Sequence, residues 1–290
     1  YSSAASDVYK RQVQQIPIGE LYPFKSHPFK VLDDESMQRT VESVAQYGVL
    51  APLIARPRPE GGYEIISGHR RQHAAELAGL ETLPVIVREM SDDAAVILMV
   101  DSNLQREHIL PSERAFAYKM KLEAIKKQGA RSDLTSARIG PKLTAAEKVA
   151  EEANDTKSQV KRFIRLTCLV PELLDMVDEK KIALNPAYEL SFLKKEEQVD
   201  LLDAMDSEQA TPSLSQAQRL KKYSQEGHLT LDMMRVIMGE EKKSDLDRVT
   251  FTSDTLRKYF PKSYTPQRMQ ETIIKLLEAW QKKRQRDQER

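Results

Sequence analysis

Four consecutive residues have the composition of a phosphate-binding turn. Gly68, His69, Arg70 and Arg71 stand where a strand pattern over residues 63–67 changes to a helix pattern. A glycine at such a junction lets the backbone approach a ligand, the helix N-terminus presents N–H groups, and two guanidinium groups can bind phosphate oxygens. An arginine pair at a helix start is also typical of a surface salt-bridge cluster. Taken alone, this stretch leaves both interpretations open.

A second polar cluster follows an apolar helical segment. Residues 101–107 read Asp-Ser-Asn-Leu-Gln-Arg-Glu, and their candidate ligand-binding side chains are Asn103, Gln105 and Arg106. The two amides could bind a base or a metal-bound phosphate, and the arginine adds a third guanidinium group. The alternative interpretation is the polar last turn of a helix.

Two helix-start patterns twelve residues apart predict a helix-turn-helix. Thr144-x-x-Glu147 and Thr156-x-x-Gln159 are capping boxes, in which a threonine side chain and a glutamate or glutamine side chain satisfy backbone N–H groups reciprocally. Asn154 occupies the turn between them, where asparagine tolerates a left-handed backbone. Asp155 departs from the pattern, because the motif usually carries an apolar residue there. The alternative is a helical hairpin with a solvated basic face.

The second of these helices, expected over residues 157–169, resembles a recognition helix. Its apolar residues fall on one face and its polar residues on the other. Polar residues near the N-terminus of such a helix contact base edges, and basic residues contact phosphates. The candidate DNA-binding residues are Thr156, Lys157, Ser158, Gln159, Lys161, Arg162 and Arg165.

The net charge of the chain hides a local asymmetry. The 290 residues include 45 lysines and arginines and 44 acidic residues, for a net charge of +1. Residues 119–142 contain seven basic and two acidic residues, residues 156–170 four basic and none acidic, and residues 171–210 four basic and eleven acidic. Only the local field acts on a phosphate within a Debye length of about 8 Å. We therefore expect a basic DNA-facing surface with an acidic region behind it.

These motifs need an α/β module followed by helices. Helices are expected over residues 34–48, 68–79, 91–108 and 111–129, from a helix start at residue 213, and from Thr265-Pro266; strands are expected over residues 49–56, 63–67 and 83–88. The predicted fold class is α+β, with a small N-terminal α/β module, an all-α helix-turn-helix domain and a helical C-terminal region. The predicted domains are residues 13–110, 111–227 and 228–290, the last with a charged tail.

Composition excludes several classes of protein. Cys168 is the one cysteine, which excludes an internal disulfide framework and a multi-cysteine zinc site. The apolar run over residues 94–100 is too short to span a membrane. We expect a cytoplasmic protein associated with the nucleoid or a plasmid. Residues 1–12 are expected to be non-native, because residues 7–12 (Asp-Val-Tyr-Lys-Arg-Gln) resemble a translated transposon end used in sequencing libraries.

In this order, the motifs resemble those of the ParB/RepB/Spo0J-type partition family. The most specific part is residues 102–107 followed by Leu110-Pro111-x-Glu113-x-Ala115-x-Ala117-Tyr118. Residues 68–71 resemble the Gly-Glu-Arg-Arg box of the family, with His69 in place of the glutamate. Residues 48–52 (Gly-Val-Leu-Ala-Pro) resemble the segment before the first strand of the family. The resemblance covers residues 13–202.

The resemblance implies a homodimer that binds a parS-like site in double-stranded DNA and uses CTP and Mg²⁺ to close into a clamp. It implies no membrane partner. A ParA-type ATPase would be its partner. By resemblance, Gly68, Arg70 and Arg71 would hold the triphosphate, Arg106 would contact phosphate, and Asn103 would bind Mg²⁺ through the nucleotide. Ser102 stands where the family often has an acidic residue, so hydrolysis of CTP is left open and catalytic residues are not assigned.

Two other functions compete with the clamp. A transcriptional regulator could use the same fold without clamping. A nuclease or nucleotide-dependent enzyme is the second alternative, although the sequence lacks a compact carboxylate cluster for two metals.

The C-terminal helix carries an apolar stripe, Met269, Ile273, Leu276 and Trp280. This stripe is either a dimer-forming surface or core, and the core interpretation is preferred.

Overall fold

The computed structural model describes residues 12–106, 109–133, 144–240, 256, 258–261 and 263–288. The predicted non-native residues 1–12 lie almost wholly outside this description. The chain divides after Gly239 into two units, which are considered separately. No helix among the described residues is long and apolar enough to cross a membrane.

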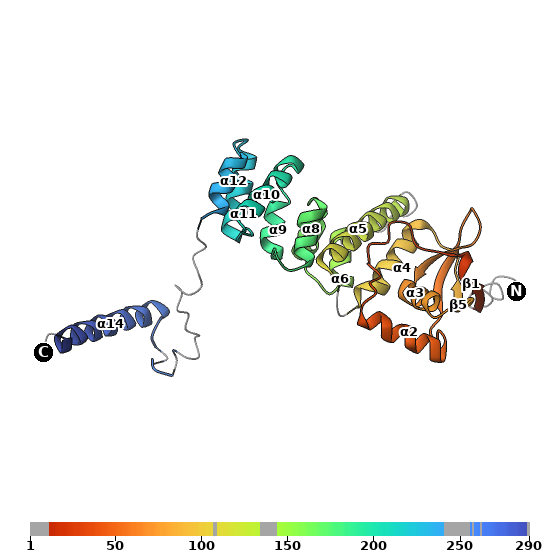
Figure 1. Ribbon diagram of the computed structural model, residues 1–290, viewed down its shortest axis with the longest axis horizontal. Coiled ribbons are helices and arrows are strands. Elements are labelled where there is room, and N and C mark those ends of the chain that lie inside the picture. The colour runs from red at the N-terminus through yellow and green to blue at the C-terminus, as the bar shows by residue number, and fades with distance from the viewer. Residues whose placement is uncertain are drawn as a thin grey trace. The chain divides into compact units, whose positions relative to one another are not determined.

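The first unit begins with a mixed sheet (Figure 1). Its strands are β1 (Val13–Pro17), β2 (Leu21–Tyr22), β3 (Leu53–Pro57), β4 (Tyr63–Ser67) and β5 (Thr82–Val87), with the short 3₁₀ helix η1 (Ile18–Glu20) between the first two. The strand order is β1-β5-β3-β4-β2. The β1–β5 and β3–β4 pairs are antiparallel, and the β3–β5 and β2–β4 pairs are parallel. The three predicted strands are present, whereas β1 and β2 were not predicted.

Helices cover both faces of the sheet. They are α2 (Glu35–Tyr47), α3 (His69–Leu77) and α4 (Asp92–Leu104). Ile65 and Ile66 are adjacent in β4 and both fully buried, because successive side chains in a strand point to opposite faces. Ile65 belongs to the core that contains residues of α2 and α3, and Ile66 to the core that contains residues of α4 and of the next helix.

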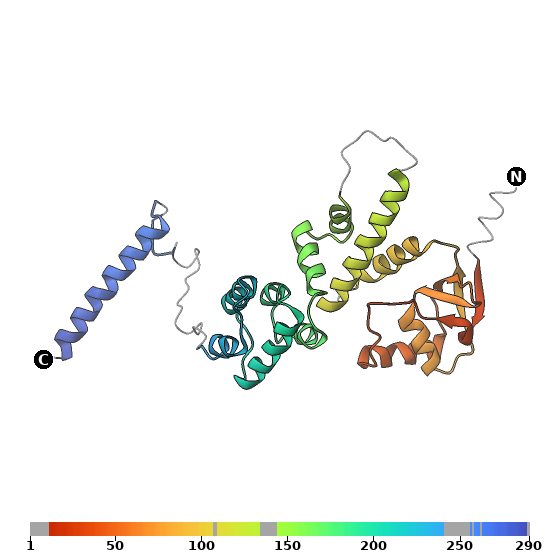
Figure 2. The ribbon, with the colours of Figure 1, turned by 90° about the horizontal axis from the view of Figure 1, so that it is seen from above.

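The rest of the first unit is helical and shares one core. Its helices are α5 (Pro111–Asp133), α6 (Ala145–Glu152), α7 (Lys157–Leu166), α8 (Pro171–Asp178), α9 (Leu184–Leu190), α10 (Lys195–Ser207), α11 (Leu214–Gln225) and α12 (Leu231–Met238). α6 and α7 lie beside α5 (Figure 2). Buried residues of α12, Met234 and Ile237, pack in the same core as Val160 of α7. α12 therefore belongs to the helical part, although the sequence placed it in the C-terminal region beyond residue 227.

The second unit contains the predicted C-terminal helix, α14 (Pro266–Gln288). The Thr265 hydroxyl accepts a hydrogen bond from the Arg268 N–H and caps this helix. Met269 is buried, but Leu276 and Trp280 are 63% and 59% exposed. The preferred interpretation of the stripe as core is therefore wrong for its C-terminal half, because nothing in the described part of this unit covers those side chains.

The predicted fold class is confirmed. The N-terminal module combines a small sheet with helices, and the described residues beyond it form helices without strands.

Candidate nucleotide and DNA sites

Gly68 is required at the start of α3 for two reasons. Its φ of +111° lies where side chains are disfavoured, and a Cβ there would lie 2.8 Å from the Leu53 Cγ atom. It forms the N-cap of a nine-residue helix without any side-chain cap. The first N–H groups of α3 are therefore available to a ligand.

Arg71 holds the segment that precedes β3. Its Nη1 atom donates to the carbonyl oxygens of Ala51 and Pro52 at 2.5 Å and 2.9 Å. Burial lowers the pKa of Arg71 from its usual value. Two motifs that the sequence placed separately, residues 48–52 and 68–71, are thus joined by one side chain.

Arg70 and Arg106 come from different elements, and their like charges act on each other. The Nη2 atom of Arg70 lies 3.2 Å from the Ser36 hydroxyl and 3.6 Å from the Asp34 carboxylate. The pKa of Arg106 is lowered mainly by burial; the Glu113 carboxylate opposes this shift, and the charge of Arg70 adds to it. Two guanidinium groups that repel each other can be stabilised together by an anion bound between them.

A hollow of about 470 Å³ opens beside Arg71. Its walls come from α2 and from the segment before β3, including Arg39, Thr40 and Leu50. Leu50 is 82% exposed, so an apolar surface faces solvent at the mouth. The hollow has the size of a small-molecule site, and Arg71 forms part of its wall.

His69 is engaged by the chain itself. Its side chain is buried, and its Nε2 atom accepts a 3.4 Å hydrogen bond from the Phe24 N–H. The centroids of the His69 and His27 rings are 3.8 Å apart. Burial lowers the pKa of His69 to about 3, and the positive charges of His27 and Arg106 add to this shift. The ring therefore supports the segment after β2, and its role as a ligand-binding residue stays a prediction without geometric support.

Asn103 and Gln105 differ in exposure. Asn103 is buried and its Nδ2 atom donates to the Met99 carbonyl oxygen at 2.8 Å, within α4. Gln105 is exposed at the C-cap of α4. The described residues contain no group of three histidine, cysteine or carboxylate side chains that could hold a metal ion.

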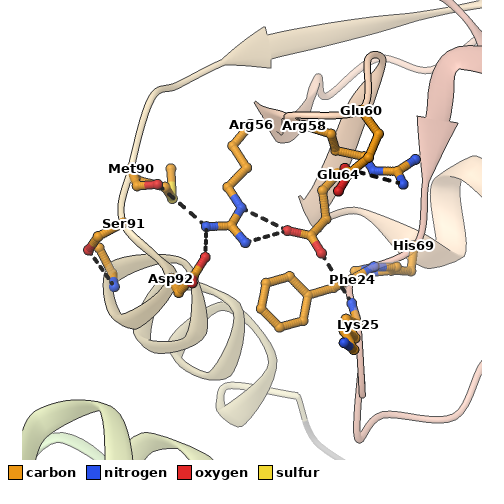
Figure 3. A network of polar contacts seen from close by, with 11 residues as sticks. Phe24, Lys25, Arg56, Arg58, Glu60, Glu64, His69, Met90, Ser91 and Asp92 are labelled. Carbon is orange, nitrogen blue, oxygen red and sulfur yellow. Dashed lines mark hydrogen bonds and ion pairs between the residues drawn. The ribbon is translucent and has the colours of Figure 1, made fainter. Parts of the chain in front are cut away.

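A polar network that the sequence did not single out positions α4 against the sheet (Figure 3). Arg56 binds the Glu64 carboxylate through Nε and Nη2, at 2.7 Å and 2.6 Å, and Asp92 through Nη1 at 2.6 Å. Glu64 also accepts from the Lys25 N–H at 3.2 Å. The network joins β3, β4, the first turn of α4 and the segment after β2. The only signal for this network in the sequence is the opposite charge of Arg56 and Glu64, which face each other on β3 and β4.

α6 and α7 form the predicted helix-turn-helix. The Thr144 capping box is present in full, and the Thr156 hydroxyl accepts from the Gln159 N–H at 3.1 Å. Asn154 has a φ of +52°, as expected for the turn. Val160, Phe163 and Leu166 are buried, which leaves the opposite face of α7 outside.

The candidate DNA-binding residues divide into two groups. Four are exposed: Thr156, Ser158, Lys161 and Arg162. The other three are partly buried: Lys157, Gln159 and Arg165. The Lys157 ammonium pairs with Glu147 at 2.9 Å. The Arg165 Nη2 atom donates to the Ser191 carbonyl oxygen at 3.0 Å, and its guanidinium lies 4.3 Å from the Phe192 ring centroid. Arg165 therefore anchors α7 to α9.

Not every basic residue counted in the sequence contributes to the predicted basic surface. Lys119, Lys126 and Lys127 are exposed on α5, but Lys121 is fully buried and paired with carboxylates. The side chains of Arg131, Arg138 and Lys142 lie outside the described residues.

These features define the class of helix-turn-helix proteins that carry an N-terminal α/β module. Residues 2–104 match the family model of the ParB N-terminal domain. The chain is 33% identical over 196 residues to stage 0 sporulation protein J of Bacillus subtilis, covering 68% of this chain and 63% of that protein. The chain is thus similar to proteins of the ParB/Spo0J family. It spans about three-fifths of the length of the curated relatives that it matches.

Solved structures of ParB from Caulobacter crescentus also match. The C-terminally truncated protein complexed to the centromeric parS site is 23% identical, with a TM-score of 0.43, and covers 78% of this chain and 98% of that one. The same protein complexed with CTP-gamma-S is 26% identical, with a TM-score of 0.31, and covers 67% of this chain and 98% of that one.

Proposed function

We propose that this chain is a partition protein that binds a parS-like DNA sequence, and that CTP gates its closure into a DNA clamp. Similarity to ParB/Spo0J proteins supports the class of function. The single observation that carries DNA binding is the exposed face of α7. Ser158, Lys161 and Arg162 are exposed on α7, and the opposite face of this helix is buried in the core.

In this proposal α7 enters the major groove of the DNA. Arg162 reads a base edge, while Lys161 and the lysines of α5 bind phosphates. Arg162 lies 5.8 Å from the ring centroid of Tyr188, which limits the freedom of its side chain before DNA binds. Arg165 and Lys157 hold α7 in place through their contacts with Ser191 and Glu147.

CTP is the ligand proposed for Arg70, Arg106 and the N-terminus of α3. Arg70, Arg106 and the N-terminal N–H groups of α3 bind its phosphates, and the adjoining hollow receives the nucleoside. Asn103 contributes to Mg²⁺ binding through the nucleotide; when bound, this ion neutralises phosphate charge. The repulsion between Arg70 and Arg106 supports an anion at this place. Hydrolysis is not part of the proposal.

A homodimer and a ParA-type ATPase complete the proposed system, and association with the nucleoid or a plasmid follows from DNA binding. Exposed Ile274, Leu276, Leu277 and Trp280 on α14 support self-association, because apolar residues at helical spacing are buried by a second helix. The ATPase partner rests on similarity to the ParB/Spo0J family alone.

The deciding experiment is calorimetric CTP titration of the full chain, with and without DNA recovered by selection from random sequence. Arg106→Ala should abolish CTP binding and leave the first encounter with DNA largely intact. If selection recovers a specific DNA but the chain does not bind CTP, the clamp is overturned and a transcriptional regulator is favoured. Metal-dependent cleavage of unselected DNA by purified protein would favour a nuclease instead.

A further inference from the structure

Lys121 is a fully buried lysine that contacts two carboxylates from different helices. Its side chain on α5 is 0% exposed, and its ammonium pairs with Asp101 of α4 and with Glu152 of α6, the latter at 2.5 Å. A single side chain thus connects the N-terminal module to the helix-turn-helix.

Both carboxylates occupy significant positions. Asp101 stands two residues before Asn103 and five before Arg106, at the end of α4 that carries the second nucleotide-binding motif. Glu152 is the last residue of α6, four residues before Thr156, the N-cap of α7. The Lys121 contacts therefore end next to the two sites of the proposed function.

The linkage is asymmetric in its burial. The Asp101 and Glu152 side chains are 43% and 51% exposed, so either carboxylate can be hydrated if it leaves the ammonium. The ammonium has no such alternative, because an unpaired charge in the interior is strongly unfavourable. When the end of α4 moves, Lys121 must either keep Asp101 or move to regain solvent, and both responses alter its contact with Glu152.

A second contact reinforces the connection on the same face of α5. Tyr118, one turn before Lys121, donates from its hydroxyl to the Asp155 carboxylate at 3.1 Å. The segment between Glu152 and Asp155, which sets the direction of α7, is thus held twice by α5.

We propose that Lys121 is a positioning residue that couples nucleotide binding at the end of α4 to the placement of α7 on DNA. This inference rests on the proposed function, since it requires both ligands. Coupling of this kind is reciprocal: whatever CTP does to DNA affinity, DNA does to CTP affinity by the same factor.

The test is the ratio of the CTP dissociation constants measured on the full chain with and without selected DNA. We expect the unmodified chain to give a ratio about fivefold or more away from one. Asp101→Asn and Glu152→Gln each remove one arm of the linkage while Lys121 keeps a charged partner. Each should bring the ratio to within about twofold of one, with little change in either affinity measured alone. The combined variant should lose no more of the coupling than either single variant, although its unpaired Lys121 ammonium should lower thermal stability.

Glu151→Gln is the matched control, because Glu151 is the exposed neighbour of Glu152 on α6. It should keep the ratio of the unmodified chain. Loss of packing alone would change thermal stability or both affinities and leave the ratio unchanged.

Three outcomes would overturn the inference. Unchanged ratios in Asp101→Asn and Glu152→Gln would overturn it while the proposed function stands. A ratio of one in the unmodified chain, with both ligands bound, would do the same. Absence of CTP binding by the unmodified chain would overturn the gating proposal and this inference together.

Discussion

The Tyr118 hydroxyl donates a hydrogen bond to the Asp155 carboxylate at 3.1 Å, directly before α7. Asp155 also accepts from the Thr156 N–H at 2.8 Å. Burial raises the pKa of Tyr118 to about 12, and the charge of Asp155 adds to this shift. The acidic residue that breaks the usual apolar pattern of the motif therefore has a specific partner on α5.

Removing both members of this pair should cost less stability than the sum of the two single changes. Tyr118→Phe keeps the edge-to-face contact with Phe163 at 5.9 Å and should cost about 1 kcal/mol of unfolding free energy. Asp155→Val leaves a buried hydroxyl without its acceptor and should cost about 1–3 kcal/mol. In urea unfolding, the double variant should cost less than the sum of the two. Strict additivity would contradict the pairing.

Arg162 and Arg165 should separate DNA recognition from stability. Arg162→Ala should weaken binding to selected DNA by about 1–3 kcal/mol and leave thermal stability nearly unchanged, because the side chain is exposed. Arg165→Ala should lower the melting temperature, because it removes the contacts with Ser191 and Phe192. Binding measured by fluorescence anisotropy and melting measured by calorimetry distinguish the two. Equal losses of affinity at equal stability would return Arg165 to the DNA interface.

Gly68→Ala should destabilise the chain more than Gly79→Ala. Both glycines have positive φ, +111° and +74°, so both variants carry backbone strain of about 1–2 kcal/mol. Only at Gly68 does the added Cβ meet a neighbour, the Leu53 side chain at 2.8 Å, whereas Gly79 faces open space. Urea midpoints of the two variants give the comparison. Equal midpoints would mean that the sheet yields to the added methyl group.

His69 should make stability depend on pH below neutrality. Its pKa is lowered from 6.5 to about 3 in the folded chain, so the unfolded chain binds the extra proton between these values. The stability contributed by the neutral ring is therefore complete above pH 6.5 and is lost as the pH falls toward 3. His69→Gln should show a smaller drop in melting temperature between pH 7.5 and pH 5 than the unmodified chain. Exposed His228→Gln is the control and should leave this drop unchanged.

The sequence by itself determined the features that depend on neighbours along the chain. The capping box at Thr144 and the left-handed Asn154 are present as expected, whereas at Thr156 only the hydroxyl half of the predicted box is present. Each of these depends on hydrogen bonds that span only three or four residues, so the residue types at that spacing are sufficient to predict them.

Only the tertiary structure decided which polar residues face solvent. The sequence does not predict β1, because its residues are mostly exposed, with Ile16 alone buried, and its partner β5 lies about 70 residues further along the chain. His69, Lys121 and Arg165 looked equivalent to their exposed neighbours until distant segments enclosed them. Burial of a polar group is set by contacts between elements remote in sequence, and the local sequence pattern does not predict those contacts.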